Sequence, residues 1–383
     1  MRVSALCPKI AEQAWIYPSK IHFLLRSNAI LRNRRGALDG FAGRAGAATI
    51  RCSHRPLAGN FTSGQCWKTA RRARGCNGHR DWPDKATVYM QKVTVRVPGS
   101  TSNLGPGFDC LGVALSIHNS VTVCRCRSRQ PSHPRIVSEA ADRFFKRARR
   151  RAFSFSCSSV ERVPRCRGLG GSATVRLGVL LALNRLSGNP LDGRMIFRLC
   201  AELEGHPDNA APAKFGGFTV VGSARCADRM LRRGMPIVQR FEVLPRLHFI
   251  LFIPDLEIQT ERARRILPSK ISRMAAVENC ANACAVTAAF ASQQYETLRG
   301  TFTDHLHQPF RSKLIPSLPR VIAAAERAGA LGGFLSGSGS TIAAVTLDAS
   351  TKVAAAMTRA ADTPGQTIIT RADNRGARIL INH

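Results

Sequence analysis

A glycine-rich segment directly before a long apolar helix constrains this chain more than any other feature. Residues 164–173 have the sequence PRCRGLGGSA, and residues 172–186 then carry apolar side chains at three- and four-residue spacing, which predicts a helix. Glycine lets the backbone approach an anion closely, and a helix N-terminus offers unpaired N–H groups and partial positive charge. The pattern indicates either a phosphate cradle or a tight strand-to-helix turn without a ligand.

Neither of two well-known nucleotide-binding motifs explains this segment. A Walker A loop needs a Gly-Lys pair followed by Ser or Thr, and the chain contains none. The spacing Gly168-x-Gly170-x-x-Ala173 fits a loose Rossmann fingerprint, with Asp192 near the distance of its ribose-binding acid. Asp192, however, is predicted to cap a helix, whereas the Rossmann acid ends a strand. The Rossmann interpretation is therefore disfavoured.

From Met90 onward, strand-like and helical patterns alternate over a length that suits two domains. The predicted strands are 93–97, 120–124, 247–253 and 341–347, and the predicted helices are 138–151, 172–186, 192–204, 273–292 and 318–328. We place the change of domain near residue 245, which gives domains at 90–245 and 246–383. Apolar residues make up 44% of the 383 residues, which excludes a collagen-like or wholly disordered chain. The apolar runs are also far shorter than the roughly 20 residues that cross a bilayer.

The chain is strongly basic, with a formal net charge of +33 that would attract polyanions. Its thirteen cysteines form no C-x-x-C pair, which favours reduced thiols over zinc modules or disulfides. Residues 1–89 hold a net charge of +12 and all three tryptophans but no sustained period, so we expect this leader to be disordered. It could be a non-native extension before Met90, an organellar transit segment or a nucleic-acid-binding arm.

Three further segments combine small residues with polar side chains, at 98–109, 204–209 and 335–341. In the first, Asn103 offers a donor and an acceptor, and Asp109 could bind an amine. The second has the sequence EGHPDN, in which a helix ends, turns and restarts, and the third is a Ser-Gly string. Each segment alone is more typical of a loop or a helix cap than of a site.

Together and in this order, the segments resemble the three signature motifs of the GHMP small-molecule kinases, most closely those of the homoserine kinase family. The resemblance runs from about Val93 to about Leu347. The matching phrases are GNPL at 188–191, AELEGHPDNAAP at 201–212, GGFT at 216–219, ARRILP at 263–268, LHQPFR at 306–311 and LIP at 314–316. The resemblance implies an α+β, two-domain fold, with an N-terminal domain like domain 2 of ribosomal protein S5 and a ferredoxin-like C-terminal domain.

The same resemblance implies that ATP lies between the domains and gives its γ-phosphoryl group to the side-chain hydroxyl of L-homoserine. The product would be O-phospho-L-homoserine, on the route to threonine. Such catalysis consists mostly of positioning and charge neutralisation. The expected location is the cytoplasm, or a plastid or mitochondrion if residues 1–89 are a transit segment. The expected partner is the small-molecule substrate, without nucleic acid or membrane, and the resemblance is compatible with a homodimer.

Binding roles follow where residues match the motifs. The loop that would wrap the triphosphate comprises Pro164, Arg165, Cys166, Arg167, Gly168, Leu169, Gly170, Gly171, Ser172 and Ala173. Ser172 and Glu204 would hold Mg²⁺, a hard cation that suits hydroxyl and carboxylate oxygens. Asn103 and Asp109 would bind the polar end of homoserine, with Arg264 and Arg311 on its carboxylate.

The residues expected at the reacting hydroxyl are Asp208, Asn209 and Arg264. Whether Asp208 acts as a general base stays open, because the proton could pass straight to the phosphate. Plainer interpretations also stay open: Asp208 as a helix cap, Glu204 as a solvated helix end and Arg311 as a surface charge. His206 is predicted to be structural.

Gly171 departs from the family's loop, which normally has the sequence GLGSSA where this chain has GLGGSA. The serine that would face Mg²⁺, Ser172, is retained, so we expect activity to survive. Gly171 lacks a hydroxyl donor and adds backbone freedom, which predicts weaker nucleotide binding.

Two other functions are compatible with parts of the sequence. Without residues 1–89 the chain still carries a net charge of +21, which suits a nucleic-acid-binding protein on an S5-like fold. Its basic residues are not interleaved with aromatic ones, however, as RNA-binding surfaces usually are. A GHMP kinase for another substrate is the second alternative, and convergence of Asn103, Arg264 and Arg311 on one pocket would discriminate against it.

Overall fold

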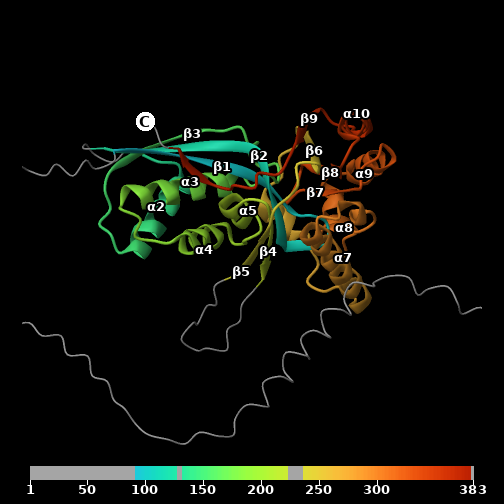
Figure 1. Cartoon of the computed structure of the whole chain (residues 1–383), viewed down its shortest axis with the longest axis horizontal. Helices are drawn as coiled ribbons and strands as arrows, with labels where there is room; N and C mark the ends of the chain where they lie inside the picture. Colours follow the sequence, from blue (N-terminus) through green and yellow to red (C-terminus); the bar gives the residue numbers. More distant parts are fainter. Residues whose placement is uncertain (1–90, 127–131, 223–235, 381–383) are drawn as a thin grey trace, which may run out of the picture. The chain divides into compact units, whose positions relative to one another are not determined.

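The computed structural model describes residues 91–126, 132–222 and 236–380 (Figure 1). The predicted leader lies outside these residues, so its three interpretations remain predictions. In chain order the elements are β1 (Lys92–Asn103), β2 (Gly107–Arg125), α2 (Arg135–Ala148), β3 (Phe155–Val160), α3 (Gly171–Leu186), α4 (Gly193–Glu204), α5 (Ala210–Phe215), β4 (Phe218–Gly222), β5 (Ile237–Phe241), β6 (His248–Pro254), α6 (Thr260–Arg265), α7 (Arg273–Ser292), the 3₁₀ turns η2 (Tyr295–Leu298) and η3 (Ser312–Leu314) on either side of α8 (Gln308–Arg311), α9 (Leu318–Arg327), β7 (Gly332–Leu335), β8 (Ile342–Thr346), α10 (Ser350–Ala360), β9 (Gly365–Thr370) and β10 (Arg378–Leu380).

The first sheet is antiparallel and has the strand order β10-β1-β2-β4-β5, with β3 also paired to β2. Strands β1 and β2 pair in a register that sets Val95 opposite Val121. Because side chains alternate along a strand, Val93, Val95 and Val97 share one face, and all three are buried. One face of this sheet therefore forms the floor of a hydrophobic core.

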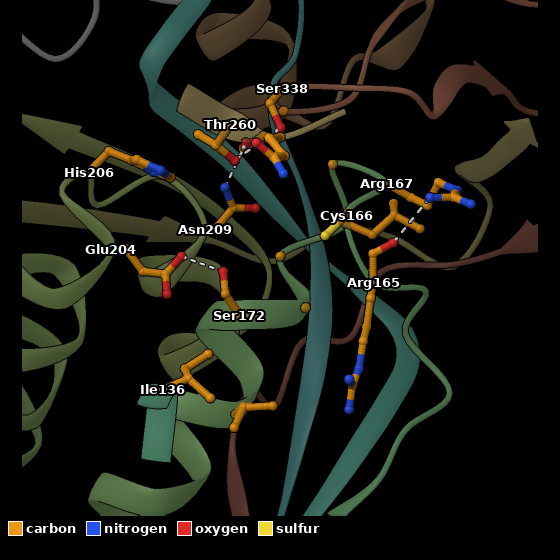
Figure 2. Close-up of a pocket in the computed structure, with 18 of the residues that line it drawn as sticks. Ile136, Arg165, Cys166, Arg167, Ser172, Glu204, His206, Asn209, Thr260 and Ser338 are labelled. Carbon is orange, nitrogen blue, oxygen red and sulfur yellow. Dashed lines mark hydrogen bonds between the residues drawn. The ribbon is translucent and has the colours of Figure 1, made fainter. Parts of the chain in front are cut away.

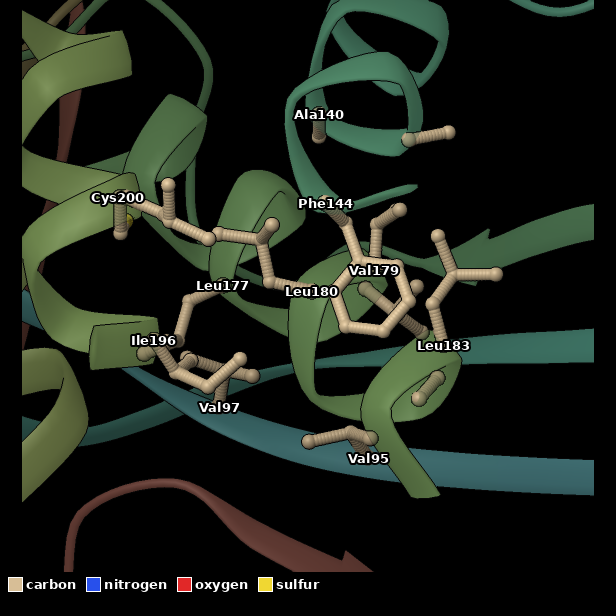
Figure 3. Packing of buried hydrophobic residues seen from close by; sticks show 14 of the residues in the cluster. Val95, Val97, Ala140, Phe144, Leu177, Val179, Leu180, Leu183, Ile196 and Cys200 are labelled. Carbon is tan, nitrogen blue, oxygen red and sulfur yellow. The ribbon is translucent and has the colours of Figure 1, made fainter. Parts of the chain in front are cut away.

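Helix α3 covers that face, and α2 and α4 pack against α3 (Figure 3). Leu177, Leu180 and Leu183 of α3 are fully buried in this core. The helix approaches the sheet closely at Gly178, where a Cβ atom would lie 2.5 Å from Cγ2 of Val121. Glycine is required there because any larger side chain would push the helix off the sheet. This packing fixes the N-terminal end of α3, where the glycine-rich segment meets it.

The second sheet is also antiparallel, with the strand order β7-β8-β6-β9. Its central strand β6 is buried along six of its seven residues, which explains its continuous apolar sequence HFILFIP. One face packs on α9 and α10 through a cluster that includes Phe252, Val321 and Met357. The mixture of helices with two antiparallel sheets confirms the predicted α+β class.

A third hydrophobic cluster joins the two sheets. It contains Leu111 and Phe218 from the first sheet and Leu251 and Phe334 from the second. Phe218 stacks on Phe290 of α7, with ring centroids 4.3 Å apart. The two sheets therefore share one core, and their relative position is set by apolar packing.

Six of the nine predicted elements coincide with observed ones within about one residue at each end, and the strands predicted at 93–97 and 120–124 are parts of the longer strands β1 and β2. The helix predicted at 138–151 is an exception, because α2 begins and ends three residues earlier. Pro134 has no N–H and precedes the first turn, and Arg149 adopts a left-handed conformation with φ of 50° that ends the helix. The chain passes from the first sheet to the second between β5 and β6. The domain boundary near residue 245 stays a prediction.

The C-terminal segment returns to the first sheet, where β10 pairs with β1. Asp373 anchors this return: its carboxylate accepts hydrogen bonds from Nε2 of His118 at 2.6 Å and from the N–H groups of Arg375 and Gly376. Nη2 of Arg378 lies 3.1 Å from the same carboxylate. Among the described residues, none of the helices combines the length and the hydropathy needed to cross a membrane.

The ionised carboxylate of Asp373 should make stability depend on pH. Burial alone would raise its pKa, but the hydrogen bonds from His118 and two N–H groups lower it to about 2, from an ordinary 3.8. Because the folded pKa is the lower one, this contribution is complete above pH 4 and disappears as pH falls from about 4 to about 2. We expect Asp373→Asn to lower the free energy of unfolding at pH 7 by about 2 kcal/mol and to flatten the loss of stability in that range.

Urea denaturation between pH 2 and pH 7 measures both effects. Asp348→Asn, at an exposed position, is the control and should leave the pH profile of the wild type unchanged. Equal pH profiles for Asp373→Asn and the wild type would contradict the assignment.

Candidate functional site

A pocket of about 420 Å³ opens where segments that are distant in the sequence meet (Figure 2). The start of α2, strand β3 and Arg311 contribute to its lining, and most of the remainder comes from residues 165–172, from the β1–β2 region at 102–109, from the turn at 204–209, from α6 and from the glycine-rich turn at 337–338. These are the segments in which the sequence concentrates glycine and polar residues. The fold therefore brings all of the predicted polar segments to one cavity.

The glycine-rich loop forms one wall of the pocket. Gly168 and Gly170 have φ of 72° and 67°, a left-handed conformation that glycine adopts without strain. A Cβ atom at Gly168 would overlap the carbonyl oxygen of Ser336, and one at Gly170 would overlap Oγ of Ser100. Ser336 also donates to the carbonyl oxygen of Gly168 at 2.7 Å. Atoms of two other segments, at Ser100 and Ser336, thus hold the loop in place directly before α3.

Helix α3 begins at Gly171, directly after this loop. The first N–H groups of a helix have no partner within it and carry partial positive charge, so they suit an anion such as phosphate. Of the ten residues predicted to wrap a triphosphate, 165–172 line the pocket. Pro164 and Ala173 flank that lining, and Ala173, in the first turn of α3, is buried in the core between α3 and the first sheet.

Ser172 and Glu204, the two predicted metal ligands, are in direct contact. Oγ of Ser172 donates to Oε2 of Glu204 at 2.7 Å. Nη1 of Arg176, one helical turn after Ser172, donates to the other carboxylate oxygen at 2.5 Å. The side chain of Glu204 is only 5% exposed, so its interpretation as a solvated helix end is wrong. A hydroxyl and a carboxylate side by side at the pocket wall fit a hard divalent cation.

Asn103 and Asp109 shape the turn between β1 and β2. Both have positive φ, at 71° and 59°. Oδ1 of Asn103 accepts the N–H of Asp109 at 3.0 Å, and Nδ2 of Asn103 donates to the carbonyl oxygen of Gly337 at 2.9 Å. Asn103 therefore closes its own turn and ties it to the second glycine-rich turn across the pocket.

Asp109 faces the C-terminal half of the chain through Arg264 of α6. The guanidinium donates Nη1 to Oδ2 at 3.0 Å and Nη2 to Oδ1 at 2.6 Å, a bidentate pair. Both side chains are about one-third exposed, so the pair lies open to the pocket. A positive and a negative charge stand side by side where a ligand would enter.

Asp208 and Asn209 occupy the floor of the pocket. Asn209 donates Nδ2 to Oγ of Ser102 at 3.0 Å and accepts from Oγ of Ser100 at 2.9 Å, so its orientation is fixed. Oδ1 of Asp208 accepts the N–H of Asn209, which precedes α5, and bonds to no N–H group of that helix, so the structure does not support the helix-cap interpretation.

His206 controls the charge of Asp208. Nδ1 of His206 lies 2.5 Å from Oδ1 of Asp208. Burial alone would raise the pKa of Asp208, but the hydrogen bond and charge of His206, with smaller contributions from Ser102 and Arg264, lower it below its usual value. Burial would likewise lower the pKa of His206, and Asp208 raises it. Asp208 is therefore a carboxylate with little tendency to take up a proton.

Arg311 is buried beside the pocket, with 2% of its surface exposed, so its interpretation as a surface charge is wrong. Its guanidinium carbon lies 5.3 Å from the ring centre of Phe108, and that of Arg264 lies 5.4 Å from the same ring. Phe108 thus contacts two like charges and attracts both through its ring face. The two arginines meet at one aromatic residue.

The sequence predicts the main polar residues of the pocket but not the residues that contact and orient them. Phe108, Arg176 and His307 contact the predicted residues, yet none was singled out. Phe108 and His307 lie inside the polar segment 98–109 and the family phrase 306–311. A single Phe or His in such a segment is more often a core residue than a site residue. Only the contacts distinguish them.

Known proteins resemble this chain in sequence. The family model "GHMP kinases N terminal domain" matches residues 135–217, and "GHMP kinases C terminal" matches residues 287–363. A homoserine kinase of Carboxydothermus hydrogenoformans is 36% identical over 313 residues, which cover 76% of this chain and 98% of that protein. A homoserine kinase of Microchaete diplosiphon is 36% identical over 310 residues, with the same coverage.

Solved structures agree with the sequence comparisons. The crystal structure of homoserine kinase from Cytophaga hutchinsonii matches with a TM-score of 0.67 and 26% identity, covering 76% of this chain and 98% of that one. A mevalonate kinase matches with a TM-score of 0.56 and 12% identity over 74% of this chain and 99% of that one. At that identity the second likeness concerns the fold alone.

Gly168 and Gly171 should respond differently to the same substitution. A Cβ atom at Gly171 would lie 3.6 Å from the carbonyl oxygen of Pro164, an ordinary contact, whereas at Gly168 it would overlap backbone in a left-handed conformation. We expect Gly171→Ser to leave the free energy of unfolding unchanged and, by adding a hydroxyl donor, to lower the KM for ATP. The matched variant Gly168→Ser should lose about 1–3 kcal/mol of stability.

Urea denaturation and initial rates at varied ATP concentration measure the two effects. An unchanged KM for ATP in Gly171→Ser would refute the expectation that Gly171 weakens nucleotide binding.

Proposed function

The chain belongs to the homoserine kinase family of the GHMP kinases, and we infer that it transfers the γ-phosphoryl group of ATP to the side-chain hydroxyl of L-homoserine. The product is O-phospho-L-homoserine, and the activity is that of a phosphotransferase in threonine biosynthesis. The observation that carries this inference is that Asn103, Arg264 and Arg311 line one pocket together with the glycine-rich loop. Such a pocket offers paired charges for an amino acid beside a loop for phosphates.

The charges of the pocket match the head group of an amino acid. An L-amino acid carries an ammonium and a carboxylate two bonds apart, and Asp109 and Arg264 present the opposite charges side by side. Asp109 would accept the ammonium group, and Arg264 with Arg311 would bind the carboxylate through guanidinium N–H groups. Asn103 would help to bind the polar end of homoserine by fixing the turn that carries Asp109.

The glycine-rich loop would bind the triphosphate. Its backbone is held close to two neighbouring segments, and the N-terminus of α3 lies directly behind it. Residues 165–172 line the pocket, including Arg165 and Arg167, whose charges favour phosphate oxygens. Pro164 and Ala173 would then act by fixing the two ends of the loop.

Ser172 and Glu204 would hold Mg²⁺, since their oxygens are adjacent and suit a hard cation. When bound, the cation would neutralise charge on the phosphate oxygens during transfer. Arg176 holds the far oxygen of Glu204 and so keeps the carboxylate turned toward Ser172.

Asp208 and Asn209 would orient the attacking hydroxyl. Asn209 is locked by Ser100 and Ser102, so its backbone and side chain form a rigid support. Asp208 is ionised and can accept a hydrogen bond from the hydroxyl, but its lowered pKa makes it a weak base. We propose that it aims the hydroxyl while the proton passes to the transferred phosphoryl group, with Arg264 adding positive charge nearby.

For partners, the proposal names a small-molecule substrate and assigns no role to nucleic acid or membrane. The cytoplasm is the proposed location, with a plastid or mitochondrion as the alternative if residues 1–89 direct the chain there. A homodimer is an expectation from the family resemblance alone.

The deciding experiment is ATP turnover with L-homoserine, compared with L-serine, mevalonate and galactose. We expect phosphorylation of L-homoserine alone, because only that acceptor combines an amino-acid head group with a hydroxyl one carbon further than in serine. Arg311→Met should raise the KM for L-homoserine at least tenfold and leave the KM for ATP near that of the wild type. The full chain and a chain beginning at Met90 should be equally active.

Turnover of mevalonate or galactose in place of L-homoserine would reject the proposed substrate while leaving a kinase. Failure to bind ATP at all would reject the kinase, and RNA binding would then be tested.

The role of Glu204 predicts a specific dependence on metal. We expect Glu204→Gln to raise the Mg²⁺ concentration for half-maximal rate about tenfold or more, because an amide is a weaker ligand for a hard cation. Glu202 lies on the same helix and pairs with Arg198. Glu202→Gln is therefore the matched control and should behave as the wild type. Equal Mg²⁺ dependence in the two variants would exclude Glu204 as a ligand.

A further inference from the structure

His307 lies behind the pocket, with no exposed surface, immediately before α8. Asp304 fixes this segment, because its Oδ2 accepts the N–H of His307 at 2.9 Å and that of Gln308 at 2.6 Å. The imidazole ring stacks on Phe108, with ring centres 5.3 Å apart. Its position is therefore set by both backbone and ring contacts.

Two hydrogen bonds determine the tautomer of His307. Nε2 lies 2.9 Å from the carbonyl oxygen of Gly105, which can only accept, so Nε2 carries the hydrogen. Nδ1 lies 3.3 Å from Nη1 of Arg311, which can only donate, so Nδ1 is the acceptor. The ring is thus neutral, with one donor and one acceptor in use.

The charges around the ring agree with a neutral imidazole. Burial lowers the pKa of His307 to about 4; Asp304 opposes this shift and Arg311 adds to it. Asp304 lies 3.5 Å away on the Nε2 side. A second positive charge beside Arg311 would be unfavourable, so the ring can serve as an acceptor for that guanidinium throughout the neutral range.

The hydrogen bonds of Arg311 account for three of its five donors. Nε donates to the carbonyl oxygen of Ala263 at 3.1 Å. Nη1 uses its two hydrogens on the carbonyl oxygen of Gly337 at 2.9 Å and on Nδ1 of His307. Among the described residues no group accepts a hydrogen bond from Nη2, and Arg311 lines the pocket. The two hydrogens of Nη2 therefore remain for a ligand.

We propose that His307 is a positioning residue that orients Arg311 so that Nη2 meets the carboxylate of the acceptor substrate. Gly337 accepts from the same nitrogen as His307, Nη1, and Ala263 accepts from Nε; His307 is the one side chain among these three partners. Since a guanidinium is planar, fixing Nε and both hydrogens of Nη1 fixes the direction of Nη2. The inference rests on the proposed function, because it concerns binding of L-homoserine.

The test compares His307→Phe with His307→Asn. The phenylalanine variant keeps a ring against Phe108 but removes the acceptor for Arg311, and we expect it to raise the KM for L-homoserine about tenfold. The KM for ATP should change less than twofold. The asparagine variant restores an acceptor near the position of Nδ1, and we expect it to recover most of the affinity for L-homoserine.

Two measurements distinguish the positioning role of His307 from a merely structural one. The first uses a substrate without a carboxylate, and the second places His307→Phe in an Arg311→Met background. With 3-amino-1-propanol, which lacks the carboxylate, His307→Phe should have the same kcat/KM as the wild type. In an Arg311→Met background, His307→Phe should not raise the KM for L-homoserine further. His118→Phe is the control, because His118 is a partly buried histidine that pairs with Asp373 away from the pocket. It should lower the free energy of unfolding without raising the KM for L-homoserine.

The outcomes distinguish this inference from the function on which it rests. If the wild type does not phosphorylate L-homoserine, the proposed function fails and the role of His307 fails with it. If the wild type is active and His307→Phe keeps the wild-type KM for L-homoserine, or loses both substrates equally, only the positioning role is overturned.

Discussion

The hydrophobic core shared by the two sheets is the constraint on which the rest of the structure depends. Phe218 of the first sheet stacks on Phe290 of α7, and the same cluster continues into Leu251 of the second sheet. Burial of this apolar surface holds the two sheets at a fixed separation. The pocket takes residues from strands of the first sheet and from α6, α8 and the β7–β8 turn around the second sheet, so its geometry follows from that packing.

The polar site is built where this core ends. Glycine allows two loops, at Gly168 with Gly170 and at Gly337, to come close to each other and to β1 there, without side chains in the way. The close approach leaves carbonyl oxygens in the interior, and side chains satisfy them: Asn103 and Arg311 both donate to Gly337. Buried polar groups must be paired, and here the pairing also orients the residues that would meet the substrate.

Each carboxylate of the site is paired with at least one hydrogen-bond donor of the protein. Asp109 pairs with Arg264, Asp208 with His206, and Glu204 with Arg176 and Ser172. Each carboxylate is therefore stabilised before any ligand arrives, so little reorganisation is needed when a zwitterion and a triphosphate enter. Preorganised charge of this kind accounts for most of what a phosphotransferase contributes.

By itself, the sequence determined the fold class, the main helices and strands, and the polar residues at which chemistry is expected. It could do so because apolar periodicity and glycine placement are local patterns, and because Asn103, Gly168–Ser172, Glu204, Asp208 and Arg264 lie in recognisable phrases. The sequence did not decide whether Arg311 is a site residue or a surface charge. It also did not single out Phe108, Arg176 or His307.

Only the tertiary structure decided those roles. Arg311 is buried because His307, Ala263 and Gly337, which come from different segments, supply its acceptors. Hydrogen bonds between residues remote in sequence leave no periodic signal, and a histidine or phenylalanine in a loop has the same local pattern whether it supports a site or fills a core. Distance and direction between side chains settle such cases, and these exist only once the chain has folded.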